Sequence, residues 1–173
     1  MSKNGLTISL NEVLFYFTRA GFGVNASIGV SEDFARSNIW IAQNGFDPSE
    51  CSLLALDNLD SQTSSLSIQF EKTGDGSHLF CPEDKVLSAI EASVSCVDWL
   101  EFNGLDGDLK LTNVDSPLLV VSALGANQCT GIQVSWTDKS NNHYEVNLKD
   151  DIEWEIISSS EAPIELSNYA DIH

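Results

Sequence analysis

The sequence IQVSWT at residues 132–137 is the first of three stretches that decide the fold; YEVNLK at residues 144–149 and IEWEI at residues 152–156 follow it. In each stretch, apolar residues alternate strictly with polar residues. Successive side chains of a strand point to opposite faces of the sheet, so this alternation is typical of a strand with one buried face and one wet face. The three stretches therefore predict an antiparallel meander near the C-terminal end of the chain.

The first 60 residues carry helix signals instead. Ser9 and Glu12 have the spacing of a capping box, in which each residue satisfies a backbone amide of the other. Apolar residues then recur every three or four positions, which predicts a helix that Gly21 and Gly23 end.

Two further helices are expected before residue 61. The second starts near residues 29–31 and ends at Gly45, which fits the position just after a helix. The third has Asp47 as its N-cap and Pro48 in its first turn, and it ends near Asp60.

The middle of the chain is typical mostly of strands. Alternation at residues 66–70 and 109–112 predicts two of them, and residues 93–102 predict another. Residues 118–121 are apolar at every position, which is typical of a central strand covered on both faces. One short helix is expected over residues 82–91, where a proline opens the segment.

Helices first and strands afterwards indicate an α+β fold, in which N-terminal helices pack on a mostly antiparallel sheet with a C-terminal meander. No repeat and no long linker divides the sequence, so we expect a single domain over residues 1–173. Within it, residues 1–60 form the helical part, residues 61–158 form mainly strands with one short helix, and residues 159–173 form a tail.

The charge of the chain excludes several classes of partner. Asp and Glu total 26 against 8 Lys and Arg, a net charge of −18. Nucleic acids and anionic membranes are densely negative, so neither is expected as the main partner. No signal peptide and no transmembrane segment is readable, which predicts a cytoplasmic protein. The four cysteines are far apart and are expected to be thiols.

His78 and Cys81 are the best candidates for catalytic residues, because an imidazole and a thiol lie three positions apart. A zinc site needs three or four converging ligands, and the chain holds three histidines. We therefore expect no metal site, and we favour a surface histidine beside a buried cysteine. Phosphate-binding loops and dinucleotide fingerprints are absent, so no cofactor is expected either.

Arg19, Glu32 and Arg36 are candidates for ligand binding near the ends of the first two helices. Arginine is scarce here, and in so acidic a chain it could bind a carboxylate or phosphate group bidentately. The simpler interpretation, which we favour, is that both arginines pair with nearby acids and that Glu32 is a helix-end residue.

Several short blocks carry a family resemblance. They are residues 9–13, 19–23, 29–35 leading to Trp40, 79–82 and 117–119. In these blocks the chain resembles a bacterial family known as domain of unknown function 3726. The family is uncharacterised, so the resemblance implies a bacterial globular domain and no particular activity.

Three hypotheses for function follow. The favoured one is an accessory or small-molecule-binding domain, with a possible homodimer through an apolar face, which predicts an apolar concavity with few titratable groups. The second is an enzyme acting on a small neutral or cationic metabolite through acids with His78 or Cys81, which predicts that two of those side chains converge in a pocket. The third is an acidic interaction protein for a basic partner.

Overall fold

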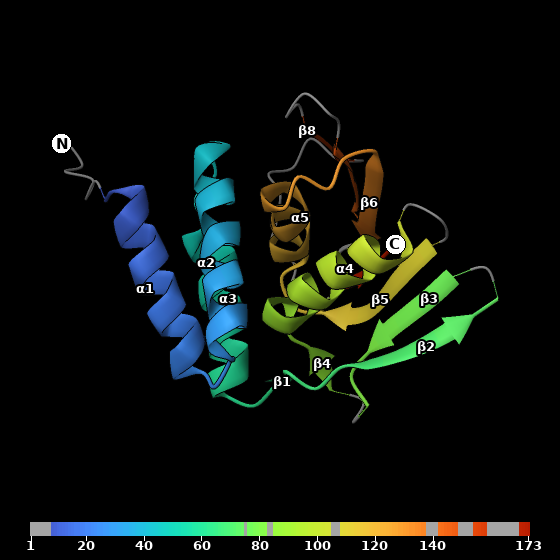
Figure 1. Ribbon diagram of the computed structural model, residues 1–173, viewed down its shortest axis with the longest axis horizontal. Coiled ribbons are helices and arrows are strands. Elements are labelled where there is room, and N and C mark those ends of the chain that lie inside the picture. The colour runs from blue at the N-terminus through green and yellow to red at the C-terminus, as the bar shows by residue number, and fades with distance from the viewer. Residues whose placement is uncertain are drawn as a thin grey trace.

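The computed structural model describes residues 8–74, 76–82, 85–104, 108–137, 142–148, 154–158 and 170–173. The helices in this part of the chain are α1 (Leu10–Gly23), α2 (Ile28–Gln43), α3 (Ser49–Asp60), α4 (Ala89–Asn103) and α5 (Pro117–Ala126). They are arranged in layers (Figure 1): α1 is outermost and packs on α2, α2 packs on α5, and α4 and α5 lie against the sheet.

The strands of the described residues form one sheet. They are β1 (Ser64–Ser65), β2 (Gln69–Thr73), β3 (Gly76–Phe80), β4 (Val86–Leu87), β5 (Asp108–Val114), β6 (Ile132–Thr137), β7 (His143–Leu148), β8 (Trp154–Ser158) and β9 (Ala170–Ile172). The order is β1-β4-β5-β9-β6-β7-β8, and β3 joins β2 to the start of β5. Three of these pairings are parallel and five are antiparallel. The α+β prediction, with helices on a mostly antiparallel sheet, is confirmed.

The C-terminal meander is present as predicted. β6 pairs antiparallel with β7, and β7 pairs antiparallel with β8. Trp136 lies opposite Tyr144, and their rings stack with centroids 5.3 Å apart. Both side chains are buried, so the apolar face of the alternating pattern is the face turned to the core.

The N-terminal helices also begin close to where the sequence places them. The capping box of α1 is formed, with the Ser9 amide donating to Glu12 Oε2 at 2.7 Å. Ser27 caps α2, slightly earlier than expected. Helix α3 begins one residue later than expected, with Pro48 and not Asp47 as its N-cap, although Asp47 accepts a hydrogen bond from the Ser49 amide at 2.8 Å.

The expectation of a central strand at residues 118–121 is wrong, because these residues lie in helix α5. Pro117 occupies the first turn, where its missing amide costs no hydrogen bond. Residues 117–124 are all buried, between α2 and α4 and under the sheet. A short segment that is apolar on all sides is compatible with a buried helix as much as with a buried strand.

The expected helix at residues 82–91 and strand at residues 93–102 are also wrong. Val86–Leu87 is the short strand β4, and α4 occupies Ala89–Asn103. Ser88 is its N-cap and accepts from the Ile90 amide at 3.3 Å. The expectation of one short helix between residues 61 and 158 is corrected accordingly, since α4 and α5 both lie there.

The expectation of a tail at residues 159–173 is corrected at its end. Residues 170–172 form β9, which lies between β5 and β6 in the middle of the sheet. Ile172 is 2% exposed and belongs to the core. Residues 159–169 lie outside the described part of the chain.

One hydrophobic cluster contains residues from both halves of the chain. It includes Phe34 and Ile41 of α2, Leu119 of α5, Leu111 of β5 and Val146 of β7. The helical layers and the sheet therefore share a core.

None of the helices in the described residues combines the length and the apolar character that crossing a bilayer requires.

Candidate functional site

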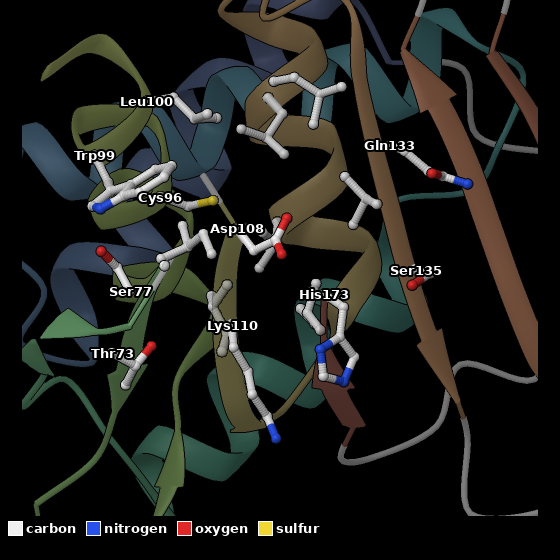
Figure 2. Close-up of a pocket in the computed structure, with 18 of the residues that line it drawn as sticks. Thr73, Ser77, Cys96, Trp99, Leu100, Asp108, Lys110, Gln133, Ser135 and His173 are labelled. Carbon is white, nitrogen blue, oxygen red and sulfur yellow. The ribbon is translucent and has the colours of Figure 1, made fainter. Parts of the chain in front are cut away.

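The short strand β9 lies in the middle of the sheet, next to a cavity. β9 pairs with β5 on one side and with β6 on the other. Residues 108–110 of β5 and residues 132–134 of β6 lie on either side of the cavity at the His173 end of β9. We call the space between them the β9 slot. Figure 2 shows Asp108 and Lys110 on one side of it, Gln133 and Ser135 on the other, and His173 at its end.

The β9 slot opens into a cavity of about 660 Å³. Val120 and Leu124 of α5 line the cavity. Trp99 of α4 lines its wall (Figure 2). Val120 and Leu124 are buried, whereas Asp108 and Gln133 are exposed at the mouth. The cavity thus has an apolar floor and a polar rim, which is the usual composition of a small-molecule site.

The backbone of β6 turns polar groups toward the slot. Ser135 donates to His173 O at 2.8 Å, and His173 donates to Ser135 O at 2.9 Å. Successive residues of a strand turn their N–H and C=O groups to opposite edges. Because the groups of Ser135 face β9, those of Gln133 face the slot.

The backbone of β5 does the same from the other side. His173 turns its groups to β6, so the preceding residue, Ile172, turns its groups to β5. Ile172 lies opposite Leu111 in the register, so the groups of Leu111 face β9. Two residues earlier, the N–H and C=O of Leu109 face the slot.

The charged groups at the rim are few and loosely paired. Lys110 Nζ lies 3.9 Å from Asp171 Oδ2, and both side chains are about half exposed. A pair of this kind contributes little to stability and remains available to a ligand.

Two buried side chains of α4, Trp99 and Cys96, line the cavity wall. Trp99 Nε1 is buried and has no hydrogen-bond partner among the described residues. Burial raises the pKa of the Cys96 thiol to about 12, so it is protonated at neutral pH. Cys96 is therefore a part of the apolar wall and not a nucleophile.

The structure places His78 and Cys81 away from the cavity. His78 Nε2 lies 2.6 Å from Thr112 Oγ1, and its ring lies 4.9 Å from that of Phe80. Cys81 follows β3 and is 5% exposed. Neither residue is among those that line the cavity. Their arrangement matches the simpler interpretation of a histidine near the surface and a buried cysteine.

Arg19, Glu32 and Arg36 likewise lie far from β9, on α1 and α2. Arg36 pairs with its own helix, at 2.5 Å from Asp33 and 3.8 Å from Glu32. The Arg19 guanidinium lies 4.9 Å from the centre of the Phe15 ring. Arg36 thus pairs with nearby acids as expected, whereas the contact of Arg19 is with an aromatic ring and not with an acid.

A second polar cluster lies at the opposite end of β5 and is closed to solvent. Asp115 is 0% exposed and accepts from the Ala89 amide at 2.7 Å and from Asn58 Nδ2 at 3.5 Å. Burial raises the pKa of Asp115 to about 7, and the hydrogen bonds to its carboxyl oppose the shift. The cluster joins α3, α4 and β5.

The described residues contain no group of three or more histidine, cysteine or acidic side chains that could hold a metal ion.

No family model matches the sequence, and no curated protein matches it. Solved structures are similar in fold. Malate dehydrogenase from Pyrococcus horikoshii OT3 matches with a TM-score of 0.62 and 12% identity, over 94% of this chain and 53% of that chain. A putative malate/lactate dehydrogenase from E. coli matches with a TM-score of 0.59 and 10% identity, over 93% and 51%.

Malate dehydrogenase from Entamoeba histolytica matches with a TM-score of 0.59 and 8% identity, over 91% of this chain and 50% of that chain. The chain therefore spans about half the length of the structures it resembles. At these identities the similarity concerns the fold, and a shared fold does not carry an activity with it.

Proposed function

We propose that the chain is a small-molecule-binding domain whose ligand occupies the cavity beneath the β9 slot. The observation that supports this most is the cavity of about 660 Å³, which combines an apolar floor at Val120 and Leu124 with a polar rim at Asp108 and Gln133. Ligand pockets typically measure about 300–1,000 Å³ and carry a small number of placed polar groups.

The buried side chains around the cavity add support. A buried indole N–H without an acceptor is unusual in a folded protein, and a ligand in the cavity is a source of the acceptor that Trp99 lacks. The free thiols Cys51, Cys81, Cys96 and Cys129 fit the reducing environment of a cytoplasm, where we place the protein.

An enzyme acting on a small metabolite is the second candidate, because the similar solved structures are named as malate and lactate dehydrogenases. This hypothesis assigned the chemistry to His78 or Cys81, and neither residue lines the cavity. Binding without chemistry at those residues therefore agrees better with the geometry.

The test is native mass spectrometry of the chain purified without chelator, compared with a variant whose cavity is filled. Leu100 is half-buried and lines the cavity, so Leu100→Trp places a large ring in existing space. Leu53 is 57% exposed on α3, so Leu53→Trp is the matched control. We expect an adduct of small-molecule mass on the wild type and on Leu53→Trp, and its loss from Leu100→Trp.

If the purified chain carries no adduct, malate, lactate and a set of neutral and cationic metabolites serve as added probes. Binding that Leu100→Trp abolishes supports the proposal. Binding that persists unchanged in folded Leu100→Trp would place the ligand elsewhere and reject it. Oxidation of malate or lactate in the presence of an added nicotinamide cofactor as the hydride acceptor would favour the second candidate.

A further inference from the structure

We infer that the outer face of α1 binds a second copy of this chain, with the two α1 helices antiparallel across a twofold axis. Helix α1 is the outermost layer of the molecule and packs on α2, on the side away from the sheet (Figure 1). This surface is separate from the cavity, so its role does not depend on the proposed function.

One side of α1 is held by α2. Val13 is 5% exposed, and the ring of Phe17 meets that of Phe34 edge-on, with centroids 5.7 Å apart. A Cβ at Gly21 would lie 3.1 Å from the side chain of Ser31, so the two helices approach each other closely there. These contacts define the inner face of α1.

The opposite side of α1 is apolar as well. A helix turns by about 100° per residue, so Phe15 and Phe22, seven positions apart, lie together on the side opposite the inner face. Phe15 is 54% exposed and Phe22 is 63% exposed, and Leu14, at 37%, borders them. A surface helix of a globular protein typically has one apolar stripe, so the second stripe of α1 indicates that a further element covers it.

The exposed apolar residues of the chain are concentrated in this region. Of the eleven large apolar side chains that are exposed among the described residues, seven lie within residues 8–28. At exposed fractions of 37–63% they leave on the order of several hundred Å² of apolar surface, close to the ~800 Å² that each partner buries in a standard interface. A concentration of this size is typical of an interaction site and not of scattered surface residues.

Charge favours a second copy as the partner. Residues 10–23 carry one acid and one base, Glu12 and Arg19, so α1 is neutral and the whole net charge of −18 lies on the rest of the chain. A basic partner is attracted to that acidic surface and not to α1. Two copies repel each other over the acidic surface, and a neutral apolar face is where they can meet with the least repulsion.

The two charges of α1 are also placed to pair between copies. Glu12 and Arg19 are seven positions apart, so they lie on the same flank of the outer face. Arg19 is exposed and forms no ion pair with an acid of the described residues; its guanidinium lies 4.9 Å from the centroid of the Phe15 ring. Across a twofold axis that passes between Phe15 and Thr18, antiparallel helices bring Glu12 of each copy near Arg19 of the other. The pair forms twice, whereas parallel helices would place Glu12 against Glu12.

The same register joins the apolar positions of the two helices. Phe15 of each copy lies beside Thr18 of the other, near the axis, and Phe22 lies beside Asn11 at each end of the contact. Side chains that recur every seven residues and interlock in this way form the seam of a coiled coil. The two positions of the seam that lack an apolar residue, Asn11 and Thr18, are each covered by a phenylalanine ring.

Sedimentation equilibrium of the full chain tests the interface. We expect a reversible dimer of twice 18.9 kDa. Phe15→Asp and Phe22→Asp each bury an unpaired carboxylate in the contact and should weaken the dimer by at least about 100-fold. Phe102 is 89% exposed on α4, so Phe102→Asp is the matched control and should dimerise as the wild type does. Circular dichroism verifies that all three variants are folded.

Two variants that each remove one charge test the antiparallel register. Glu12→Gln keeps the capping box, which a glutamine also forms, and Arg19→Gln removes the guanidinium. We expect each to weaken the dimer by about threefold to tenfold, the effect of losing two exposed ion pairs. The double variant should be no weaker than the weaker single variant, because both substitutions remove the same pairs.

Three results would overturn the inference. The first is a wild-type chain that stays monomeric at every concentration. The second is a dimer that folded Phe15→Asp and Phe22→Asp leave unchanged, since its interface would lie on another surface. The third is a dimer that Glu12→Gln strengthens, which would show parallel helices with their acids opposed. None of the three concerns the cavity, so this interface and the proposed binding site can fail separately.

Discussion

The two ends of β5 use polar residues in opposite ways. At its start, Asp108 and Lys110 are exposed and line the rim of the cavity. Just past its end, Asp115 is completely buried and accepts hydrogen bonds from Ala89 and Asn58. One strand thus connects an open polar rim to a closed polar junction.

The difference separates a polar group that the fold needs from polar groups that are available to bind a ligand. A buried polar group costs free energy unless it is paired, so the junction at Asp115 must be satisfied for the chain to fold. The polar side chains at the rim of the slot are exposed, so a ligand can replace the water that solvates them. Substitutions at the two ends should therefore differ in their effects on stability.

The largest expected effect is a pH dependence that comes from Asp115. Its pKa is about 7 in the folded chain and has its ordinary value of 3.8 when the chain unfolds. Between these values the folded state holds the proton more tightly, so this residue makes stability decrease as the pH rises from about 4 to about 7, and the effect is constant above that. A separation of about three pKa units corresponds to about 4 kcal/mol.

Urea denaturation of the wild type and of Asp115→Asn across this pH range measures the effect. The other acids titrate alike in both proteins and cancel in the difference. We expect Asp115→Asn to gain stability relative to the wild type as the pH rises. A constant difference would mean that Asp115 titrates normally.

The next effect is the loss of the junction in Asp115→Ala. The Ala89 amide would be left buried without an acceptor, and the Asn58 amide would lose its contact. We expect a loss of about 2–3 kcal/mol at a pH of about 5, seen as a lower urea midpoint. Asp108→Ala, at the other end of β5, is the control and should change stability by less than about 0.5 kcal/mol.

The sequence predicted those parts of the fold that are encoded locally. Period-2 alternation predicted β6 and β7, and the Ser9–Glu12 capping box predicted the start of α1. It predicted α5 wrongly, because residues 118–121 are apolar on every side and carry no period. Pro117 is the residue in this segment that indicates a helix start.

The candidate site was harder to predict, because it is made by a non-local pairing. The cavity lies where β9 inserts between β5 and β6. Residues 170–173 carry no sequence pattern that predicts this insertion. His78 and Cys81 were singled out by residue type, but the spacing does not say which surfaces they reach. The sequence predicts the two strands that flank the slot. It does not predict that they lie on either side of β9 in one sheet.

A smaller effect is expected at Gly76, which borders the open end of β5. A Cβ at Gly76 would lie 2.5 Å from the backbone oxygen of Asp108, so β3 or β5 must shift in Gly76→Ala. We expect a loss of about 1–2 kcal/mol, measured as a lower Tm, together with weaker ligand binding. Gly23→Ala has no heavy atom within 4 Å of the new Cβ and should be neutral or slightly stabilising.

The smallest effect is expected for Lys110→Met, which removes the 3.9 Å contact with Asp171. Both side chains are about half exposed, so solvent screens the pair, and we expect a change of less than about 0.5 kcal/mol in the free energy of unfolding. Urea denaturation at low and at moderate salt measures it, and the small difference should shrink further as salt is added. A loss above about 1 kcal/mol that persists in salt would show that the start of β5 is held by its charges. The slot would then be as much a part of the fold as the junction at Asp115, and the contrast between the two ends would fail.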